Sequence, residues 1–355
     1  MITIFTPSFA DEADTNAQNL SVKEIIARLD PGRFAVTMLH EGAPDPRIAA
    51  RPNTRLLRWR KHGNTARGIL DLLTHTPDIY FFPREGPLDA AFLKLRRALN
   101  LRTRLITYIV SGGLYLQPYA PARERNIREA DAVVANNTYL AELLKEKMGI
   151  QASAVIYDAA DRRYFFPPAP NEQCRDIAVL CAGSLRPYKQ VSSVVQQAAR
   201  HPEVRFRIAG TGEEEQECRD LAARLNCRNV EFLGHLSPAQ LGSEMRAADI
   251  FFFPSIVEGH PQVLVQAAAS GLPVVCSRIY RPDYVRDGIT GFLADNDQDF
   301  SEKLDCLIRD PRLRAKMSSA SISHAANYDW SSVTRNWEKI FQRVLHDKPR
   351  VQERS

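Results

Sequence analysis

Short apolar runs alternate with segments of helical periodicity along both halves of the chain. The runs predict buried strands, most of them bounded by Pro, Gly or other turn residues. In the first half, strands are expected at Ile2–Thr6, Phe34–Leu39, Asp78–Phe82, Leu105–Val110 and Ala132–Ala135, and helices at Asn16–Leu29, before Ala130 and at Tyr139–Met148. Strands that alternate with helices predict a parallel sheet with helices on both faces.

The second half repeats this alternation. Its strands are expected at Ile177–Cys181, Arg205–Ala209, Val230–Leu233, Ile250–Phe253 and Pro273–Cys276. Its helices are expected at Gln190–Ala199, Glu213–Leu225, Pro238–Ala247, Pro261–Ala269, 302–309 and 311–326, with a last helix from Trp330 to about Leu345. Because 355 residues exceed one ordinary core, two α/β domains are expected, 1–168 and 169–329. The Pro-rich and polar stretch 167–175 is the predicted linker.

The stretch 249–276 is the most informative part of the chain. Pro254 ends an apolar strand, and Pro261 fits the first turn of a helix that Gly271 ends. Loops at the carboxyl ends of such strands bind ligands in open α/β sheets. Glu258 precedes the helix, whose unpaired N–H groups attract anions. A ligand that carries both phosphates and hydroxyls, such as a nucleotide-sugar, fits these groups. A buried strand–helix–strand unit with Glu258 as helix cap is the alternative reading.

This stretch resembles the donor-site signature of retaining glycosyltransferases of the GT-B fold, family 4 (glycosyl transferases group 1). It reads Glu-Gly-x-Pro, an Ala-rich helix and Gly-Leu-Pro-Val-Val. The resemblance implies two Rossmann-like, doubly wound domains facing a cleft, with helix 330–346 returning to the first domain. It also implies transfer of a hexosyl unit from a UDP- or GDP-linked sugar to an acceptor hydroxyl, with retention. No other cofactor and no metal are expected.

The resemblance also assigns roles to single residues. The family carries two glutamates eight positions apart, the first on the donor sugar and the second on the ribose. Glu258 matches the first, whereas Gln266 stands at the second and can hydrogen-bond a hydroxyl without charge assistance. Lys189 matches a lysine on the donor diphosphate, and Arg186 stands in for a family arginine. Further donor-side residues are Gly183, Ser184, Gly210, Gly212, His235, Gly259, His260 and Pro261.

The first domain fits the family pattern less closely. The loop from Ser8 to Asn19 has no glycine, and no histidine follows Leu105–Val110. Acceptor-side contacts are expected from Asn16, Arg84, Glu85 and Ser111. Two other functions therefore stay open. One is a non-catalytic nucleotide-sugar-binding protein of the same fold. The other is an NAD-dependent oxidoreductase, against which the incomplete Gly-x-Gly at Gly210 counts.

The positive charge lies in the first half. Residues 1–168 hold 23 Lys and Arg against 18 Asp and Glu, whereas the remaining residues hold 24 of each. Basic clusters occur at 55–61 and 94–97, and Arg102 and Arg104 follow the second cluster. They suit a glycan or lipid-linked acceptor that carries phosphate, or peripheral contact with an anionic membrane. A solvated helix face is the alternative explanation, and no nucleic-acid partner is expected.

Other patterns suggest a cytoplasmic protein. The six cysteines are scattered without Cys-x-x-Cys, which predicts free thiols. No basic region precedes the first apolar run, so no signal peptide is expected, and no apolar stretch approaches the ~18–20 residues that span a bilayer. The Asp-x-Asp at Asp295 to Asp297 is read as helix capping, because Ser301 and Glu302 then open a helix.

Overall fold

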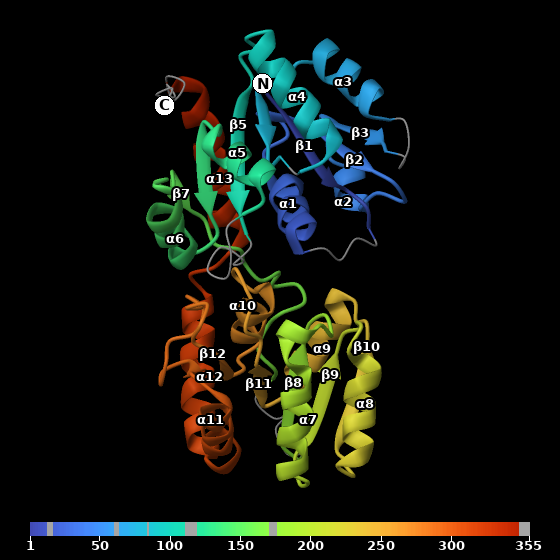
Figure 1. The fold of residues 1–355 in the computed structure, drawn as a ribbon. Helices are drawn as coiled ribbons and strands as arrows, with labels where there is room; N and C mark the ends of the chain where they lie inside the picture. The colour runs from blue at the N-terminus through green and yellow to red at the C-terminus, as the bar shows by residue number, and fades with distance from the viewer. Residues whose placement is uncertain (13–16, 60–63, 84, 111–118, 170–175, 348–355) are drawn as a thin grey trace. The chain divides into compact units, whose positions relative to one another are not determined.

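The computed structural model describes residues 1–12, 17–59, 64–83, 85–110, 119–169 and 176–347 (Figure 1). The chain divides into two compact units. Unit 1 combines Met1–Tyr157 with the segment from Trp330 onward, and unit 2 is Asp158–Asp329. The division between Tyr157 and Asp158 precedes the boundary at residue 168 that the sequence suggests, so the segment leading to the predicted linker belongs to unit 2.

Unit 1 contains a seven-stranded parallel sheet in the order β3-β2-β1-β4-β5-β6-β7. Its strands are β1 (Ile2–Phe9), β2 (Phe34–His40), β3 (Thr54–Arg58), β4 (Ile79–Phe81), β5 (Arg104–Ile109), β6 (Ala132–Ala135) and β7 (Ala154–Val155). Its helices are α1 (Ala17–Arg28), α2 (Pro46–Ala49), α3 (Asn64–Thr74), α4 (Pro87–Ala98), α5 (Pro121–Arg128), α6 (Thr138–Met148) and α13 (Trp330–His346).

Helix α6 shows how local sequence fixes an element. The side chain of Asn137 accepts a hydrogen bond from the backbone N of Leu140 at 2.6 Å, which satisfies a donor that the first turn leaves open. Gly149 ends the helix in the left-handed conformation at φ 67°. Between these two caps, Leu140 and Leu144 are buried against the sheet. The predicted helix Tyr139–Met148 is therefore confirmed to within one residue.

Helix α13 packs within unit 1, although it lies far from the rest of that unit in sequence. Its Trp337 is fully buried, with ring centroids 4.9 Å from both Phe81 of β4 and Tyr108 of β5. Phe341 lies one turn further along the helix, and its ring centroid is 6.0 Å from that of Phe34. These aromatic contacts attach the last described helix to the sheet of unit 1.

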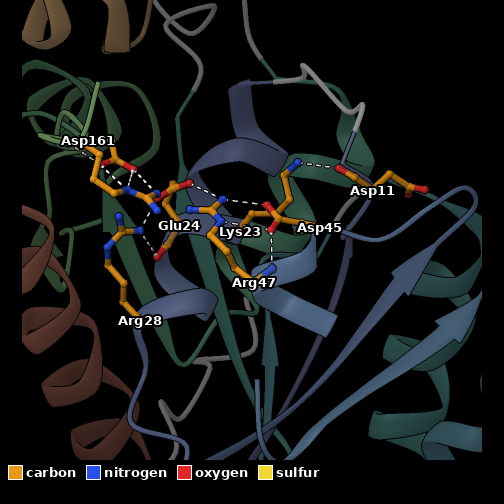
Figure 2. A network of polar contacts seen from close by, with 8 residues as sticks. Asp11, Lys23, Glu24, Arg28, Asp45, Arg47 and Asp161 are labelled. Atoms are coloured by element: carbon orange, nitrogen blue, oxygen red, sulfur yellow. Dashed lines mark hydrogen bonds and ion pairs between the residues drawn. The ribbon is translucent and has the colours of Figure 1, made fainter. Parts of the chain in front are cut away.

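Figure 2 shows a polar network around Lys23 of α1. The side chain of Lys23 is 2% exposed, and its Nζ donates to the backbone oxygen of Asp11, after β1, at 2.6 Å. Arg47 bridges Glu24 and Asp45 at 2.7 Å each. Burial would raise the pKa of Asp45, but hydrogen bonds from Arg47 outweigh it and lower that pKa. The network thus holds the loops after β1 and β2 against α1.

Unit 2 contains a six-stranded parallel sheet in the order β10-β9-β8-β11-β12-β13. Its strands are β8 (Ala178–Ala182), β9 (Arg205–Ala209), β10 (Val230–Gly234), β11 (Ile250–Phe253), β12 (Val274–Ser277) and β13 (Gly291–Ala294). Its helices are α7 (Val191–Arg200), α8 (Glu215–Arg224), α9 (Pro238–Ala247), α10 (Gln262–Ala269), α11 (Asp297–Arg309) and α12 (Pro311–Ala325), with a short 3-10 helix at Pro187–Lys189.

The strand order of unit 2 has a functional consequence. The chain runs outward from β8 through β9 to β10 and then returns to the other side of β8 as β11. The direction of winding therefore reverses between β8 and β11, whose Leu180 and Phe251 are register partners. In doubly wound sheets, ligands bind outside the carboxyl ends of the strands at such a switch point. The loops that follow β8 and β11 are accordingly the first place to look for a site.

Candidate functional site

Two oppositely charged side chains meet at the switch point of unit 2. Lys189 ends the 3-10 helix that follows β8, and Glu258 lies in the loop that follows β11. The Lys189 ammonium donates to Glu258 Oε1, and the two side chains are only 13% and 11% exposed. They come from positions far apart in sequence, so the fold rather than local sequence brings them together.

Ser255 and Tyr188 fix the position of Glu258. The fully buried Ser255 hydroxyl donates to Glu258 Oε1 at 2.6 Å, and its Oγ lies 3.3 Å from the backbone oxygen of Tyr188. The same oxygen accepts a hydrogen bond from the backbone N of Ile256 at 2.9 Å. The loop after β11 is therefore tied to the 3-10 helix after β8, and the carboxylate is held by protein groups from both loops.

Aromatic rings flank the ammonium group of Lys189. Its Nζ lies 4.9 Å from the ring centroid of Phe253, at the end of β11, and 5.4 Å from that of Tyr188. Ring faces attract a cation within about 6 Å. The ammonium group thus stands between a carboxylate and two rings, in surroundings that keep its charge positioned with little side-chain freedom.

The Gly-x-Gly after β9 is required by close backbone packing. A Cβ on Gly210 would lie 1.8 Å from the backbone oxygen of Gly183, and one on Gly212 would lie 2.3 Å from that of Leu185. Two backbone hydrogen bonds of 3.0 Å, from Gly183 to Ala209 and from Leu185 to Thr211, join the same two loops. The glycines therefore let the loops after β8 and β9 touch, and a nucleotide contact for them stays a prediction.

The segment before α10 is buried rather than open. Pro261 is the N-cap of α10, so the helix starts one residue later than the sequence suggests. The His260 side chain is 4% exposed, and its ring centroid lies 3.7 Å from that of Tyr284. Burial lowers the pKa of His260 well below its ordinary value, because the interior disfavours the charged ring. The neutral ring of His260 thus supports the loop that carries Glu258. Gly259, next to His260, is also buried.

Several predicted site residues do not join this cluster. Ser184, Arg186 and His235 are exposed, and Gln266 of α10 is half-buried. Within the described residues, none of these four side chains forms a hydrogen bond or ion pair with Lys189 or Glu258. Glu85 of unit 1 is exposed after β4. The acceptor-side predictions Asn16, Arg84 and Ser111 lie outside the described residues.

Sequence reasoning missed three residues of the cluster: Tyr188, Phe253 and Ser255. Phe253 looked like the last residue of a buried strand and Ser255 like a turn residue. A weak signal was present, because a hydroxyl three positions before a carboxylate in a loop often bonds locally. The contacts with Lys189 could not be inferred, since they join the ends of two different strands.

The Asp-x-Asp segment is a helix cap, as its sequence context suggested. Asn296 accepts a hydrogen bond from the backbone N of Asp299 at 3.0 Å and is the N-cap of α11. Asp295 pairs with Arg278 at 3.0 Å. Helix α11 begins at Asp297, earlier than the predicted 302, because this cap precedes the apolar periodicity. In the part of the chain that the structure describes, no group of three His, Cys, Asp or Glu residues could hold a metal ion.

Two further expectations bear on the cellular setting. The five cysteines within the described ranges are free thiols, and Cys174 lies outside those ranges. Burial raises the pKa of Cys181 and of Cys276 to about 12. None of the described helices is both long and apolar enough to cross a bilayer.

Sequence comparison finds a family match within unit 2. Residues 165–324 match the family model described as glycosyl transferases group 1. A D-inositol 3-phosphate glycosyltransferase of Thermobifida fusca is 30% identical over 243 residues, 61% of this chain and 56% of the relative. That of Corynebacterium kroppenstedtii is 32% identical over 176 residues, 46% and 39% of the two chains. The chain thus spans about half the length of the curated relatives it matches.

Structural comparison extends over nearly the whole chain. A sucrose-phosphate synthase from Thermosynechococcus elongatus superposes with a TM-score of 0.80 at 15% identity, covering 98% of this chain and all of the other. HepE of Anabaena, solved with UDP and glucose, gives 0.75 at 18% identity, covering 97% and 100%. The predicted fold class of two Rossmann-like, doubly wound α/β domains is confirmed. By sequence, residues 165–324 are thus similar to the group 1 glycosyl transferases, and by structure the chain has the fold of GT-B glycosyltransferases.

Proposed function

We propose that the protein is a glycosyltransferase of family 4 that uses a nucleotide-diphosphate sugar as donor. It transfers a hexosyl unit to an acceptor hydroxyl with retention at the anomeric carbon and without a metal ion. The observation that carries this proposal is the pairing of Lys189 with Glu258 at the switch point of unit 2, within the segment that resembles group 1 glycosyl transferases. Lys189 would offer a positive charge to the diphosphate, and Glu258 would offer hydrogen-bond acceptors to the sugar.

The chemistry follows from what each group can stabilise. A nucleoside diphosphate leaves with growing negative charge, and a fixed cation beside it lowers the barrier to bond cleavage. Lys189 supplies that cation, and the N-terminal end of the α10 macrodipole adds partial positive charge. Arg186 is exposed on the same loop and would add a second positive charge for the diphosphate. Glu258 accepts hydrogen bonds from sugar hydroxyls.

Binding of the donor exchanges partners within this cluster. A phosphate oxygen replaces Glu258 as the acceptor for the Lys189 ammonium, and sugar hydroxyls replace Lys189 as donors to Glu258. Ser255 keeps the carboxylate in place during the exchange, because its hydroxyl bonds the same Oε1. Gln266 would hydrogen-bond the ribose as a neutral group, which makes the ribose contact weaker than that of a charged glutamate.

Relatives suggest the ligand classes. The curated relatives are named D-inositol 3-phosphate glycosyltransferases, which act on a phosphorylated polyol by that name, and HepE was solved with UDP and glucose. For this chain we infer a UDP-linked hexose first, a GDP-linked one second, and an acceptor that is a glycan or a lipid-linked phosphate compound. Peripheral membrane contact through the basic residues of unit 1 remains part of the proposal.

Slow donor hydrolysis tests the proposal without knowledge of the acceptor. The full chain is incubated with UDP-glucose or GDP-mannose, and the released sugar is followed by proton NMR, which also reports its first anomeric form. We expect release in the configuration of the donor, and a loss of about 100-fold in Lys189→Ala, because a preorganised cation contributes several kcal/mol to the transition state.

Lys303→Ala is the matched control, since Lys303 pairs with Asp299 on α11, outside the two site loops, and its loss should leave hydrolysis unchanged. Donor binding without any release would favour the non-catalytic alternative. Release of the inverted sugar would contradict the retaining mechanism while leaving the donor site intact.

A further inference from the structure

Unit 1 contains a cavity of about 260 Å³ between the middle of β1, the carboxyl ends of β2 and β3, and helices α3 and α4. Most of its wall is apolar, formed by Phe5, Leu39, Leu57, Trp59 and Leu88. These side chains come from β1, β2, the end of β3 and α4, and α3 closes the remaining side. Pockets for small molecules begin at roughly 300 Å³, so this cavity suits a segment of a ligand.

A glycine inside α3 keeps this space open. Gly68 lies in the middle of the helix, where glycine costs about 1 kcal/mol relative to alanine. A Cβ at Gly68 would lie 2.9 Å from Leu88 Cδ1 and 3.3 Å from Trp59 Cζ3, both on residues that line the cavity. The helix therefore gives up stability at the position where a side chain would press on the cavity wall.

Two arginines line the same cavity with their charge uncommitted. Arg58 and Arg67 are exposed, and within the described part of the chain neither side chain forms a hydrogen bond or an ion pair. The carboxylate of the lining residue Asp71 is already engaged by Arg55, with Nη2 to Oδ2 at 2.7 Å. Two guanidinium groups beside an apolar wall thus lack a partner anion in the described structure.

We propose that this cavity binds an amphipathic anion, an alkyl chain that ends in a phosphate. The chain would lie against Leu39, Leu57 and Leu88, and the phosphate would accept paired hydrogen bonds from Arg58 and Arg67, whose planar groups match phosphate geometry. A bare sugar would leave the apolar wall unmatched, and a bare phosphate would leave the cavity unfilled. The site belongs to unit 1 and does not depend on the Lys189–Glu258 cluster of unit 2.

Calorimetric titration of the full chain with three matched probes tests this site. The probes are octyl phosphate, octylammonium and inorganic phosphate, all below micelle-forming concentrations. We expect octyl phosphate to bind at least about tenfold more tightly than either of the others, because only it satisfies both the apolar wall and the arginines. Equal binding of octylammonium would overturn the role of the arginines, and equal binding of inorganic phosphate would overturn the role of the cavity.

Variants locate the site. The double change Arg58→Gln and Arg67→Gln should lower the affinity for octyl phosphate by about tenfold or more. Lysines at both positions should restore part of that affinity. Arg102→Gln is the control, because Arg102 is an exposed arginine of unit 1 that does not line the cavity. If Arg102→Gln weakens binding as much as the double change does, general charge explains the binding and the proposal is wrong.

A filling variant gives an independent reading. Gly68→Ala improves the helix but moves Leu88 or Trp59, so octyl phosphate should bind more weakly while the thermal midpoint of the protein stays the same or rises. Unchanged affinity in Gly68→Ala would place the alkyl chain elsewhere and overturn the proposed cavity. Donor hydrolysis is measured separately on the same variants. Failure of octyl phosphate binding can therefore be distinguished from failure of the proposed transferase activity.

Discussion

Glu258 and Lys189 combine burial and charge in a way that a surface ion pair does not. Each side chain is largely withdrawn from water, and each has a second partner, Ser255 for the carboxylate and Phe253 for the ammonium. Removing one charge would leave the other partly desolvated, which costs more than the pair contributes. Glu258→Gln carries the same charge penalty as truncation to alanine, but it keeps the side-chain volume and an acceptor for Ser255, so its effect reports the charge alone.

His260 gives the loop after β11 a dependence on pH. Burial holds its pKa well below the value of about 6.5 in the unfolded chain, so the unfolded state takes up a proton first as pH falls. Stability is therefore fully present above about pH 6.5 and is lost as pH decreases toward the folded pKa. We expect the thermal midpoint to fall between pH 7.5 and pH 5.5, and His260→Phe, which keeps a ring on Tyr284, to reduce that fall.

The measurement is differential scanning calorimetry at the two pH values. His235→Gln, the loss of an exposed histidine in the same unit, serves as the control. An equal fall in wild type and His260→Phe would mean that other groups carry the pH dependence. The carboxylates with lowered pKa values, such as Asp45 and Asp287, lose their contribution only as pH falls below about 4.

The succession of strands and helices along the chain was accessible from sequence, because apolar runs and helical periodicity alternate so regularly, whereas the strand order within each sheet came from the structure. The second unit was predicted almost element by element, and α9 has the same bounds in sequence and structure. Strand β3 was missed, since its two leucines are flanked by Arg55 and Arg58 and the segment read as a basic cluster on a helix face. In the structure Leu56 pairs with Met38 of β2, and Arg55 pairs with Asp71 of α3.

The contact between the loops after β8 and β9 sets up a sharp comparison of two glycines. Gly210→Ala places a methyl group 1.8 Å from the backbone oxygen of Gly183, at a φ of 131° that side chains rarely adopt. Gly234→Ala, at φ 67°, meets nothing within 4 Å and costs only about 1–2 kcal/mol for the left-handed backbone. We expect Gly210→Ala to cost about 3 kcal/mol or more, since a backbone oxygen must move.

Urea unfolding of both variants measures the difference. Gly210→Ala should also weaken nucleotide binding, because Gly183 precedes Lys189 on the displaced loop. Equal destabilisation by the two changes would mean that the loops relax at little cost and that their contact does not fix the site.

Across the first half of the chain, ion pairs occupy several arginines of the basic clusters, although the net excess of positive charge is unchanged. Arg96 and Arg104 both pair with Asp131, at 2.8 and 3.1 Å, and Arg97 pairs with Glu129 at 2.8 Å. Sequence counting could not reveal these pairs, because the partners lie some thirty positions away along the chain. Among the described residues, the side chains of Arg58 and Arg67, beside the cavity of unit 1, form no such ion pair. Their positive charge is available for an anionic ligand.

Sequence singled out the two loops that meet at the switch point of unit 2, but not all of the contacts between them. The signature around Glu258 identified the loop after β11, and Lys189 identified the loop after β8. The partners Ser255 and Phe253 emerged only from the structure, because they act across two loops. The predicted acceptor-side residues Asn16, Arg84 and Ser111 fall outside the described residues, and Glu85 is exposed after β4.

In the proposed nucleotide-sugar site, Lys189 contacts the diphosphate and Glu258 contacts the sugar. Calorimetric titration with UDP, GDP, ADP and NAD, on wild type and Glu258→Gln, tests these two roles. We expect one nucleoside diphosphate to bind and NAD not to bind. Glu258→Gln should bind that diphosphate at least as tightly, because Lys189 loses its competing partner, yet lose the added affinity for the sugar conjugate. Binding of NAD alone, or no binding of any nucleoside diphosphate at millimolar concentration, would contradict a nucleotide-sugar site at Lys189 and Glu258.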